Sequence, residues 1–242
     1  MPTAAVPDMR NATSAKDCVA EWAWLGRVAY GAALRLQEQA RDEVADGARD
    51  LLLMLEHDPV ITLGRAANVE HVLAPAEALS ASGISVVRTS RGGDVTMHGP
   101  GQLTGYPIFR LRRGVRAHIR AMADGIAAVL SELGIAAEWR ESTPGLWVGQ
   151  NKICAFGVHV RRRVAMHGFA LNMNNDLDCF QMIVPCGLRQ AGVTSTAALL
   201  GFRLDLAKTA QQIARAFEQS FESKFVCISA SSSRLQIANG NQ

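Results

Sequence analysis

The sequence predicts an α+β protein in which helices flank a mixed β-sheet. Three segments, 22–45, 115–133 and 204–221, carry apolar residues at helical spacing. Between the second and third helices lie five short apolar segments separated by turn-forming residues, as expected for consecutive antiparallel strands. Helices that bury one apolar stripe commonly pack it against such a sheet.

The first half of the chain is expected to mix helices and strands. The expected elements are a helix over 22–45, strands in 51–64, a helix over 74–82, and strands over 84–89 and 103–111. Asp58 and Pro59 divide 51–64 into strand, turn and strand. The helix over 115–133 ends at Gly134, a residue typical of a helix C-terminus.

The second half reads as strands followed by one helix. The strand segments are AAEWRE, GLWVG, KICAFGVHV, RRVAMHGFALNM and MIVPCGL, and the last helix covers 204–221. We therefore expect a loose N-terminal extension over 1–20, a single domain over 21–228, and a flexible tail over 229–242.

Composition narrows the class of protein. Hydrophobic residues make up 48% of the chain and charged residues 19%, as in a soluble globular protein, and no apolar run is long enough to span a bilayer. The net charge of +3 is too small to indicate nucleic-acid binding. The first 18 residues contain Asp8 and Asp17 and no apolar core, which argues against a secretory signal or a mitochondrial presequence. We expect a cytoplasmic protein that binds neither nucleic acid nor membrane.

Arginines gather in two places. The first cluster is Arg110, Arg112, Arg113, Arg116 and Arg120, and the second is Arg161, Arg162 and Arg163. Such clusters are either ordinary solvated surface or a basic surface that guides an acidic partner.

The five cysteines include no CxxC pair, so neither a disulfide framework nor a structural zinc site is expected, and a reducing compartment fits best. Cys186 is the best candidate nucleophile, because it lies where an apolar strand meets Gly187. A thiol needs a neighbour that helps to remove its proton. Lys152, the only lysine between Lys16 and Lys208, begins an apolar strand and is the candidate for that role. A buried inert thiol and a solvent-facing lysine remain the structural alternatives.

The segment RGGDVTMHGPGQLTGYP, residues 91–107, has the glycine content of a tight binding loop. It contains neither a dinucleotide fingerprint in strand-to-helix context nor a P-loop. Backbone amides around Gly99 and Gly101 could surround an oxygen atom. His98 has no metal-ligand spacing to a second residue, and we expect it to orient other groups rather than act as a base.

Four segments in order, RGGDVTMHGPGQLTGYPI, GLWVGQNKICAFGVHV, MHGFALNMNNDL and IVPCGLRQAGVTS, resemble the lipoyl(octanoyl) transferases. The resemblance covers about residues 51–200 and implies the mixed-sheet fold of biotin and lipoate protein ligases. It implies that Cys186 accepts the acyl group and that Lys152 is its catalytic partner. It also implies a substrate-binding set: Arg91, Gly92, Gly93, Thr96, His98, Gly99, Gly101, Gln102, Gly157, His167, Gly168 and Asn172. Gly64 and Arg65 resemble a further pocket-edge segment.

The resemblance implies transfer of an octanoyl group through a cysteine thioester, the first step of endogenous lipoate cofactor biosynthesis. The implied donor is octanoyl-acyl carrier protein. The implied acceptors are apo lipoyl domains of 2-oxoacid dehydrogenase complexes and the glycine cleavage H protein. Because a thioester is more reactive than the amide that replaces it, the reaction is expected to need no cofactor and no metal.

Two departures and three alternatives accompany this resemblance. Met97 stands where the family usually has tyrosine and is expected to alter the pocket, and Cys154, two residues after Lys152, is a possible second nucleophile. The main alternative is an ATP-dependent lipoate or biotin protein ligase, which needs no cysteine. A non-catalytic binder of acylated protein and a hydrolase that pairs Cys186 with His98 or His167 are the others.

Overall fold

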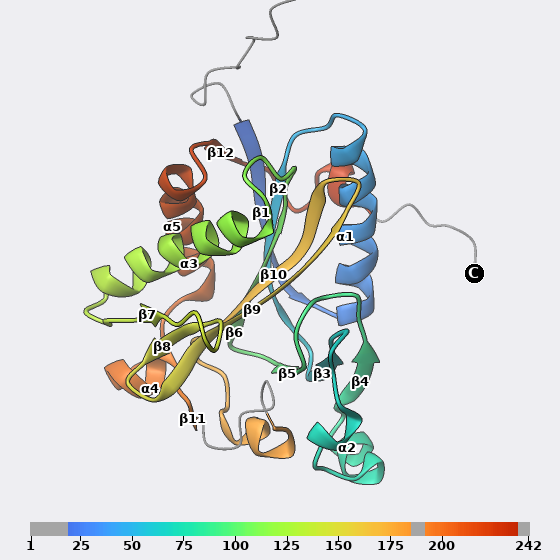
Figure 1. The fold of residues 1–242 in the computed structure, drawn as a ribbon, viewed down its shortest axis with the longest axis vertical. Coiled ribbons are helices and arrows are strands. Elements are labelled where there is room, and N and C mark those ends of the chain that lie inside the picture. Colours follow the sequence, from blue (N-terminus) through green and yellow to red (C-terminus); the bar gives the residue numbers. More distant parts are fainter. Residues whose placement is uncertain (1–18, 185–191, 237–242) are drawn as a thin grey trace, which may run out of the picture.

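The computed structural model describes residues 19–184 and 192–236 of the 242-residue chain. A nine-stranded mixed sheet forms its centre, with the strand order β12-β1-β2-β6-β10-β9-β8-β7 and β11 paired to β9 (Figure 1). Its strands are β1 (Val19–Val28), β2 (Leu51–His57), β6 (Gln102–Ile108), β7 (Glu138–Trp139), β8 (Leu146–Val148), β9 (Asn151–Arg161), β10 (Val164–Asn172), β11 (Gly192–Val193) and β12 (Lys224–Cys227).

Helices cover both faces of this sheet, as predicted (Figure 1). They are α1 (Tyr30–Ala45), α3 (Val115–Glu132), α4 (Thr196–Leu200) and α5 (Leu206–Ser220). Strand β2 shows how two cores form, because its side chains alternate between the faces. Leu51, Leu53 and Leu55 pack with α1, whereas Leu52 and Met54 pack with α3 and α5.

The first element differs from the expected helix over 22–45. Residues Val19–Val28 form β1, which pairs in parallel with both β2 and β12. Trp22 joins the core beneath α3 and α5, and Ala23 joins the core beneath α1. The apolar spacing of Trp24 and Val28 suits a helix, but a short apolar run is compatible with either a helix or a strand. Pairing with β2 makes this segment a strand.

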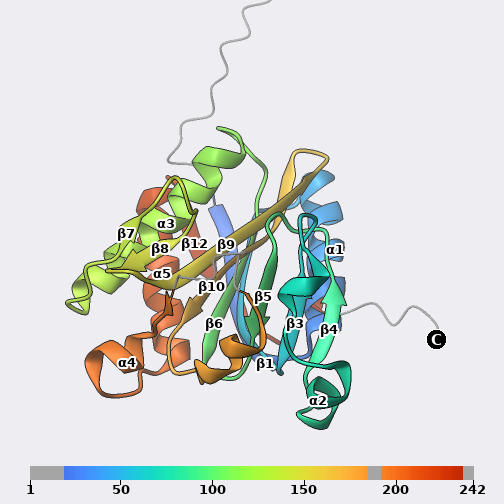
Figure 2. The same cartoon turned by 60° about the horizontal axis from the view of Figure 1, so that its bottom comes forward.

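A second, three-stranded sheet lies beside the large one (Figure 2). It has the order β4-β3-β5, formed by β4 (Ser85–Arg88), β3 (Val60–Leu63) and β5 (Val95–His98). Its own apolar core includes residues of α2 (Ala76–Ala81) and of the 3₁₀ helix η3 (Asp178–Met182). A further 3₁₀ helix, η2 (Val69–His71), follows β3. Although 51–64 forms two strands as predicted, β2 and β3 belong to different sheets.

Two C-terminal segments also differ from expectation. MIVPCGL was expected to be a strand, but its described part forms the end of η3 and an isolated bridge between Ile183 and Val72. Residues 229–242 were expected to be a flexible tail, yet η5 (Ser233–Leu235) lies within them. Leu235 is buried beneath α1, and Arg234 forms ion pairs with Glu21 and Glu43. Among the described residues, no helix has both the length and the apolar character that a bilayer span requires.

Candidate active site

The glycine-rich loop makes a tight turn between β5 and β6. Gly101 has a φ of +85°, and a Cβ there would lie 2.7 Å from the backbone of Asn174. Its amide donates to Glu56 Oε2 at 2.7 Å, and the next amide donates to the Gly99 carbonyl at 3.1 Å. The Gly101 amide, which we expected to help surround a ligand oxygen, is therefore used within the protein. The turn holds β6 against the end of β10.

Gln102 joins the glycine-rich loop to Asn172 at the end of β10. Its Nε2 donates to Asn172 Oδ1 at 2.9 Å and to the Met97 carbonyl at 3.1 Å, so its Oε1 faces His98 Nδ1 at 2.8 Å. This arrangement places the His98 proton on Nδ1. Burial lowers the pKa of His98 to about 3, so its imidazole is neutral. A neutral, hydrogen-bonded imidazole suits the orienting role expected from the sequence.

Arg91 fastens the start of the loop to the small sheet. Its guanidinium donates to the Thr62 carbonyl at 2.6 Å and to Thr62 Oγ1 at 2.9 Å. The loop then crosses β9, where the Gly92 amide donates to the Val158 carbonyl at 2.9 Å. A Cβ on Gly64 would lie 2.3 Å from the Gly93 carbonyl oxygen. Glycine at position 64 therefore permits the close contact between the end of β3 and the loop.

His167 interrupts the regular geometry of β10. Its φ is +58°, a conformation that costs a residue other than glycine about 1–3 kcal/mol. The His167 amide donates to Gln37 Oε1 at 2.9 Å, and its Nε2 lies 3.0 Å from Ser90 Oγ. Burial lowers its pKa to about 3. These contacts hold a neutral His167 between α1 and the segment before the loop.

A narrow cavity lies between the β9–β10 ladder, the glycine-rich loop and the start of α1. Seven predicted binding residues line it: Arg91, Gly93, Thr96, His98, Gly157, His167 and Gly168. The other five, Gly92, Gly99, Gly101, Gln102 and Asn172, are not among its lining residues. The loop and the HGFALN segment, 76 residues apart at Arg91 and His167, are thus brought to one cavity.

Small residues on the ladder leave room for the cavity. Gly157 pairs with Gly168, and Ala155 pairs with Ala170, so these four positions share one face of the sheet. Ala155 and Ala170 leave space above the ladder, whereas the two glycines let the backbones of Gly92 and Gly105 approach it closely. The four small residues can be read from the sequence. Whether they lie opposite one another depends on the register of β9 against β10, which the sequence alone did not supply.

Sequence reasoning missed several lining residues, among them both tyrosines. Tyr30 and Tyr106, the only tyrosines of the chain, both line the cavity. His57 Nε2 lies 2.6 Å from the Tyr106 hydroxyl, and burial lowers the pKa of His57 to about 4. For Tyr106 the sequence did carry a signal, because a tyrosine lies there within an apolar strand. A buried tyrosine hydroxyl needs a hydrogen-bond partner, so such a residue points to a polar contact.

Met97 does not shape this cavity, contrary to expectation. It is 3% exposed and packs with Ile61 and Leu79 in the core of the small sheet. Its neighbours Thr96 and His98 line the cavity instead. Side chains alternate along a strand, so residue 97 of β5 faces away from the cavity.

Lys152 lies near the start of β9 and is 8% exposed. Its Nζ lies 3.4 Å from the Pro144 carbonyl oxygen and 5.0 Å from the centre of the Trp147 ring. A Cβ on Gly145 would lie 3.0 Å from Lys152 Cε, so glycine there leaves space for the lysine stem. On its other side, β11 pairs with β9 at this residue, and the Thr194 amide donates to the Lys152 carbonyl at 3.0 Å. The end of the Lys152 side chain is therefore held in a largely desolvated place.

Burial makes two of the described cysteines poor nucleophiles. Cys154 is 1% exposed within the core beneath α3 and α5, and burial raises the pKa of its thiol well above the usual range. Burial also raises the pKa of Cys179, with Asp176 adding to the effect. Cys227 is exposed at the end of β12, at the edge of the large sheet. Cys186, the predicted nucleophile, falls within residues 185–191, outside the described part of the chain.

The two arginine clusters meet at the end of the sheet far from Lys152. The Leu111 amide donates to the Arg163 carbonyl at 2.8 Å, and Arg110 forms a bridge with Val164. Arg161 follows Lys152 by nine positions along β9, which is about 30 Å at the usual rise per residue. Charges this far apart are largely screened at physiological ionic strength, where the Debye length is about 8 Å. Arg161 therefore lies too far along β9 to act electrostatically on Lys152.

Comparison with known proteins agrees with the four ordered motifs. A family model described as the lipoyl protein ligase A/B catalytic domain matches residues 29–218. An octanoyltransferase of Myxococcus xanthus is 46% identical over 212 residues, which cover 84% of this chain and 59% of that protein. An octanoyltransferase of Solibacter usitatus is 48% identical over 202 residues, covering 82% of this chain and 91% of that protein.

Solved structures confirm the predicted fold class. The lipoate protein ligase of a bipartite system from Thermoplasma acidophilum superposes with a TM-score of 0.74 at 17% identity, covering 90% of this chain and 89% of that one. At this identity, the likeness concerns the fold alone. The family rests instead on the match over residues 29–218 and on the curated relatives, and the chain belongs to the lipoyl protein ligase A/B catalytic domain family.

Proposed function

We propose that this protein transfers an octanoyl group from octanoyl-acyl carrier protein to the acceptor lysine of apo lipoyl domains, the first step of endogenous lipoate cofactor biosynthesis. The octanoyltransferase relatives, at 46% and 48% identity, are the observation that carries this proposal. The cavity beside the β9–β10 ladder is the proposed acyl site. The acceptors are the lipoyl domains of 2-oxoacid dehydrogenase complexes and the glycine cleavage H protein.

The cavity suits a hydrocarbon chain because small residues floor it. Ala155, Gly157, Gly168 and Ala170 offer no polar side chain. The polar groups of His98 and Tyr106 are already engaged with Gln102 and His57. A chain that enters therefore displaces few hydrogen bonds. Burying the seven carbons beyond the carbonyl is worth roughly 5 kcal/mol at about 0.8 kcal/mol per methylene.

The proposed chemistry uses Cys186 as nucleophile and Lys152 as general base. Neutral Lys152 takes the thiol proton, and the thiolate attacks the donor thioester, so that a new sulfur–carbon bond forms. The carrier thiolate leaves and takes the proton from the Lys152 ammonium. The neutral acceptor amine then attacks the cysteine thioester, an amide forms, and Cys186 regains a proton. Lys152 is 8% exposed, so the proposed proton transfer takes place away from bulk solvent.

Intact-mass measurement tests the nucleophile. After incubation with octanoyl-acyl carrier protein, the full-length protein should carry one octanoyl group, which Cys186→Ala should lack. Cys154→Ala is the matched control, because that thiol is buried with a raised pKa, and it should keep the adduct. An adduct that persists in Cys186→Ala would move the covalent step to another residue.

An ATP-dependent ligase remains the second candidate, because the fold also occurs in the lipoate protein ligase of Thermoplasma acidophilum. Free octanoate with ATP and Mg²⁺ should leave an apo lipoyl domain unmodified, whereas octanoyl-acyl carrier protein alone should modify it. Modification by the free acid and ATP would assign the ligase reaction instead.

A further inference from the structure

The proposed acyl cavity extends across three neighbouring strands of the large sheet. Ala155 of β9 pairs with Ala170 of β10, which pairs with Thr104 of β6, and all three residues line the cavity. Two spacings between neighbouring strands amount to about 10 Å. An extended octanoyl chain spans about 8 Å from its first carbon to its last, since three backbone-like bonds cover about 3.5 Å. The distance from β9 to β6 therefore matches the length of an octanoyl group.

The proposed chemistry lies on the β9 side of this cavity. Lys152 is a residue of β9, and its Nζ lies 3.4 Å from the Pro144 carbonyl oxygen and 5.0 Å from the centre of the Trp147 ring. Trp147 belongs to β8, which pairs with β9 on the side opposite to β10. With the reacting carbonyl near Lys152, the tail of the acyl chain extends toward β6.

Two buried tyrosine rings lie at the β6 side of the cavity. Tyr106 follows Thr104 on the same face of β6 and is 3% exposed, and Tyr30 begins α1 and is 6% exposed. The His57 ring connects them, because it lies 5.2 Å from the Tyr30 ring and 5.9 Å from the Tyr106 ring. We call Tyr30 and Tyr106 the tyrosine wall. It stands where the tail of the acyl chain ends.

Hydrogen bonds hold both rings of the tyrosine wall. His57 Nδ1 lies 2.7 Å from the Val28 carbonyl oxygen, so this nitrogen carries the proton and donates it. His57 Nε2 is then an acceptor, and the Tyr106 hydroxyl donates to it at 2.6 Å. The Tyr30 hydroxyl forms a hydrogen bond with the Thr89 side chain. Displacing either ring breaks a buried hydrogen bond, so the tyrosine wall resists a longer chain.

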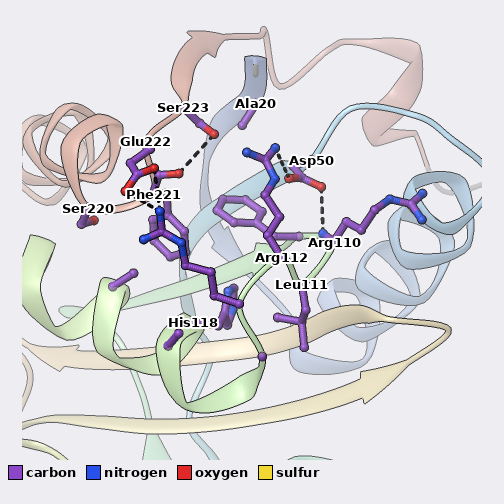
Figure 3. Close-up of a pocket in the computed structure, with 15 residues that line it drawn as sticks. Ala20, Asp50, Arg110, Leu111, Arg112, His118, Ser220, Phe221, Glu222 and Ser223 are labelled. Atoms are coloured by element: carbon purple, nitrogen blue, oxygen red, sulfur yellow. Dashed lines mark hydrogen bonds and ion pairs between the residues drawn. The ribbon is translucent and has the colours of Figure 1, made fainter. Parts of the chain in front are cut away.

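A second cavity lies on the other face of the large sheet (Figure 3). His118 and Phe221 are among its lining residues and belong to the side that α3 and α5 cover. Tyr106 packs on the opposite face, in the core beneath α1. The two cavities share no lining residue, and the sheet separates them. A chain that reaches the tyrosine wall therefore does not continue into the second cavity.

We propose that Tyr30 sets the longest acyl chain that the enzyme transfers, with Tyr106 as the fixed back of the cavity. This inference rests on the proposed octanoyl transfer and names the residue that limits its substrate. Eight carbons fit between β9 and the tyrosine wall, whereas further methylenes must displace a hydrogen-bonded ring. Tyr30 is the residue to replace, because its loss leaves the hydrogen bond between His57 and Tyr106 in place.

Transfer from hexanoyl-, octanoyl- and dodecanoyl-acyl carrier protein to an apo lipoyl domain tests this role in the full-length protein. For the wild type, kcat/KM with the dodecanoyl donor should be about 10²-fold or more below that with the octanoyl donor. Tyr30→Ala should raise the ratio of dodecanoyl to octanoyl kcat/KM at least about tenfold, because it opens space for several methylenes. Tyr30→Trp enlarges the ring and should shift the preference toward the hexanoyl donor.

Two controls separate cavity length from a loosened helix α1. Tyr30→Phe keeps the ring and should keep the chain-length ratio of the wild type. Leu235→Ala also removes packing beneath α1, but it lies outside the cavity lining and should leave the ratio unchanged. Melting temperatures confirm the fold of each variant, and a gain with the longer donor does not arise from instability.

The outcomes distinguish this inference from the proposed function. Octanoyl transfer by the wild type, with unchanged chain-length ratios in both Tyr30→Ala and Tyr30→Trp, would overturn the role of Tyr30 alone. If Tyr30→Ala does not fold, an unchanged preference in Tyr30→Trp overturns it. Absence of octanoyl transfer by the wild type would instead contradict the proposed function and this inference with it.

Discussion

Gly157 and Gly168 face each other across β9 and β10, and neither position has room for a side chain. A Cβ on Gly168 would lie 2.3 Å from the Gly105 carbonyl oxygen, and one on Gly157 would lie 3.0 Å from the Gly92 carbonyl oxygen. Both glycines line the proposed acyl cavity. This pair brings the glycine-rich loop and β6 close to the ladder and sets the width of the space between them.

Narrowing the cavity should change the acyl-chain preference. In Gly157→Ala the new methyl group is tight against Gly92 and occupies cavity space. We expect kcat/KM for the octanoyl donor to fall about tenfold, with a smaller decrease for a butanoyl donor, because a lost methylene-sized space costs about 1–3 kcal/mol. Steady-state rates with both donors provide the measurement. Equal decreases for the two donors would indicate general damage and contradict this role.

The turn before β6 offers a matched pair of glycine variants. Gly101→Ala places an L-residue at a φ of +85° and its Cβ 2.7 Å from the Asn174 backbone, so it should lower the free energy of unfolding by more than about 2 kcal/mol. Gly99→Ala meets open space at an ordinary φ and should change it by less than about 1 kcal/mol. Urea unfolding of both variants measures the difference. Similar values for the two would show that the turn is not held as described.

Removing the Lys152 amine should slow acylation while leaving the fold intact. Lys152→Met keeps an unbranched apolar stem beside Trp147, so its melting temperature should stay close to that of the wild type. The rate of thioester formation at pH 7 should fall about 10²–10⁴-fold, the usual contribution of a positioned base.

The pH dependence separates this role from a structural one. The residual rate of Lys152→Met should rise with pH, as an unassisted thiol ionises near its usual pKa of about 8.5. Rapid-quench measurement of acylation from pH 6 to pH 9 tests this. A rate at pH 7 within tenfold of the wild type would remove Lys152 from the proposed chemistry.

Buried neutral histidines should make stability fall in mild acid. Burial lowers the pKa of His57 and His118 to about 4 and of His98 and His167 to about 3, whereas an unfolded chain titrates near 6.5. The unfolded state therefore binds more protons below pH 6.5. Their contribution to stability is complete above that pH and is lost as the pH falls toward the folded-state values.

The slope of this loss can be assigned to single residues. Each buried histidine should remove about 1.4 kcal/mol of unfolding free energy per pH unit between about pH 6 and pH 5, where most carboxylates are still ionised. His118→Phe keeps the ring packing against Phe109 and Phe221. It should reduce the slope of unfolding free energy against pH by the contribution of one histidine. Urea unfolding at pH 7, 6 and 5 measures it. An unchanged slope would mean that His118 is not held neutral in the fold.

Local patterns in the sequence identified most of the helices and strands, but neighbours in space decided the exceptions. Residues 22–28 have apolar spacing compatible with a helix, yet they form a strand because β2 pairs with them and β12 pairs with the start of the same strand. Met97 is adjacent to His98 in the sequence, yet it packs in another core because alternate residues of β5 face opposite ways. Neither outcome could be derived without the partner strands.

The sequence alone determined the family and the chemistry to be expected, because four motifs in a fixed order specify catalytic residue types and their spacing. Only the tertiary structure decided which residues share a cavity. The register of β9 against β10 aligns Gly157 with Gly168, and the fold brings Arg110, Arg112 and Arg113 to a separate cavity. Such relations arise from strand pairing and packing between distant segments, which a local pattern of residues does not encode.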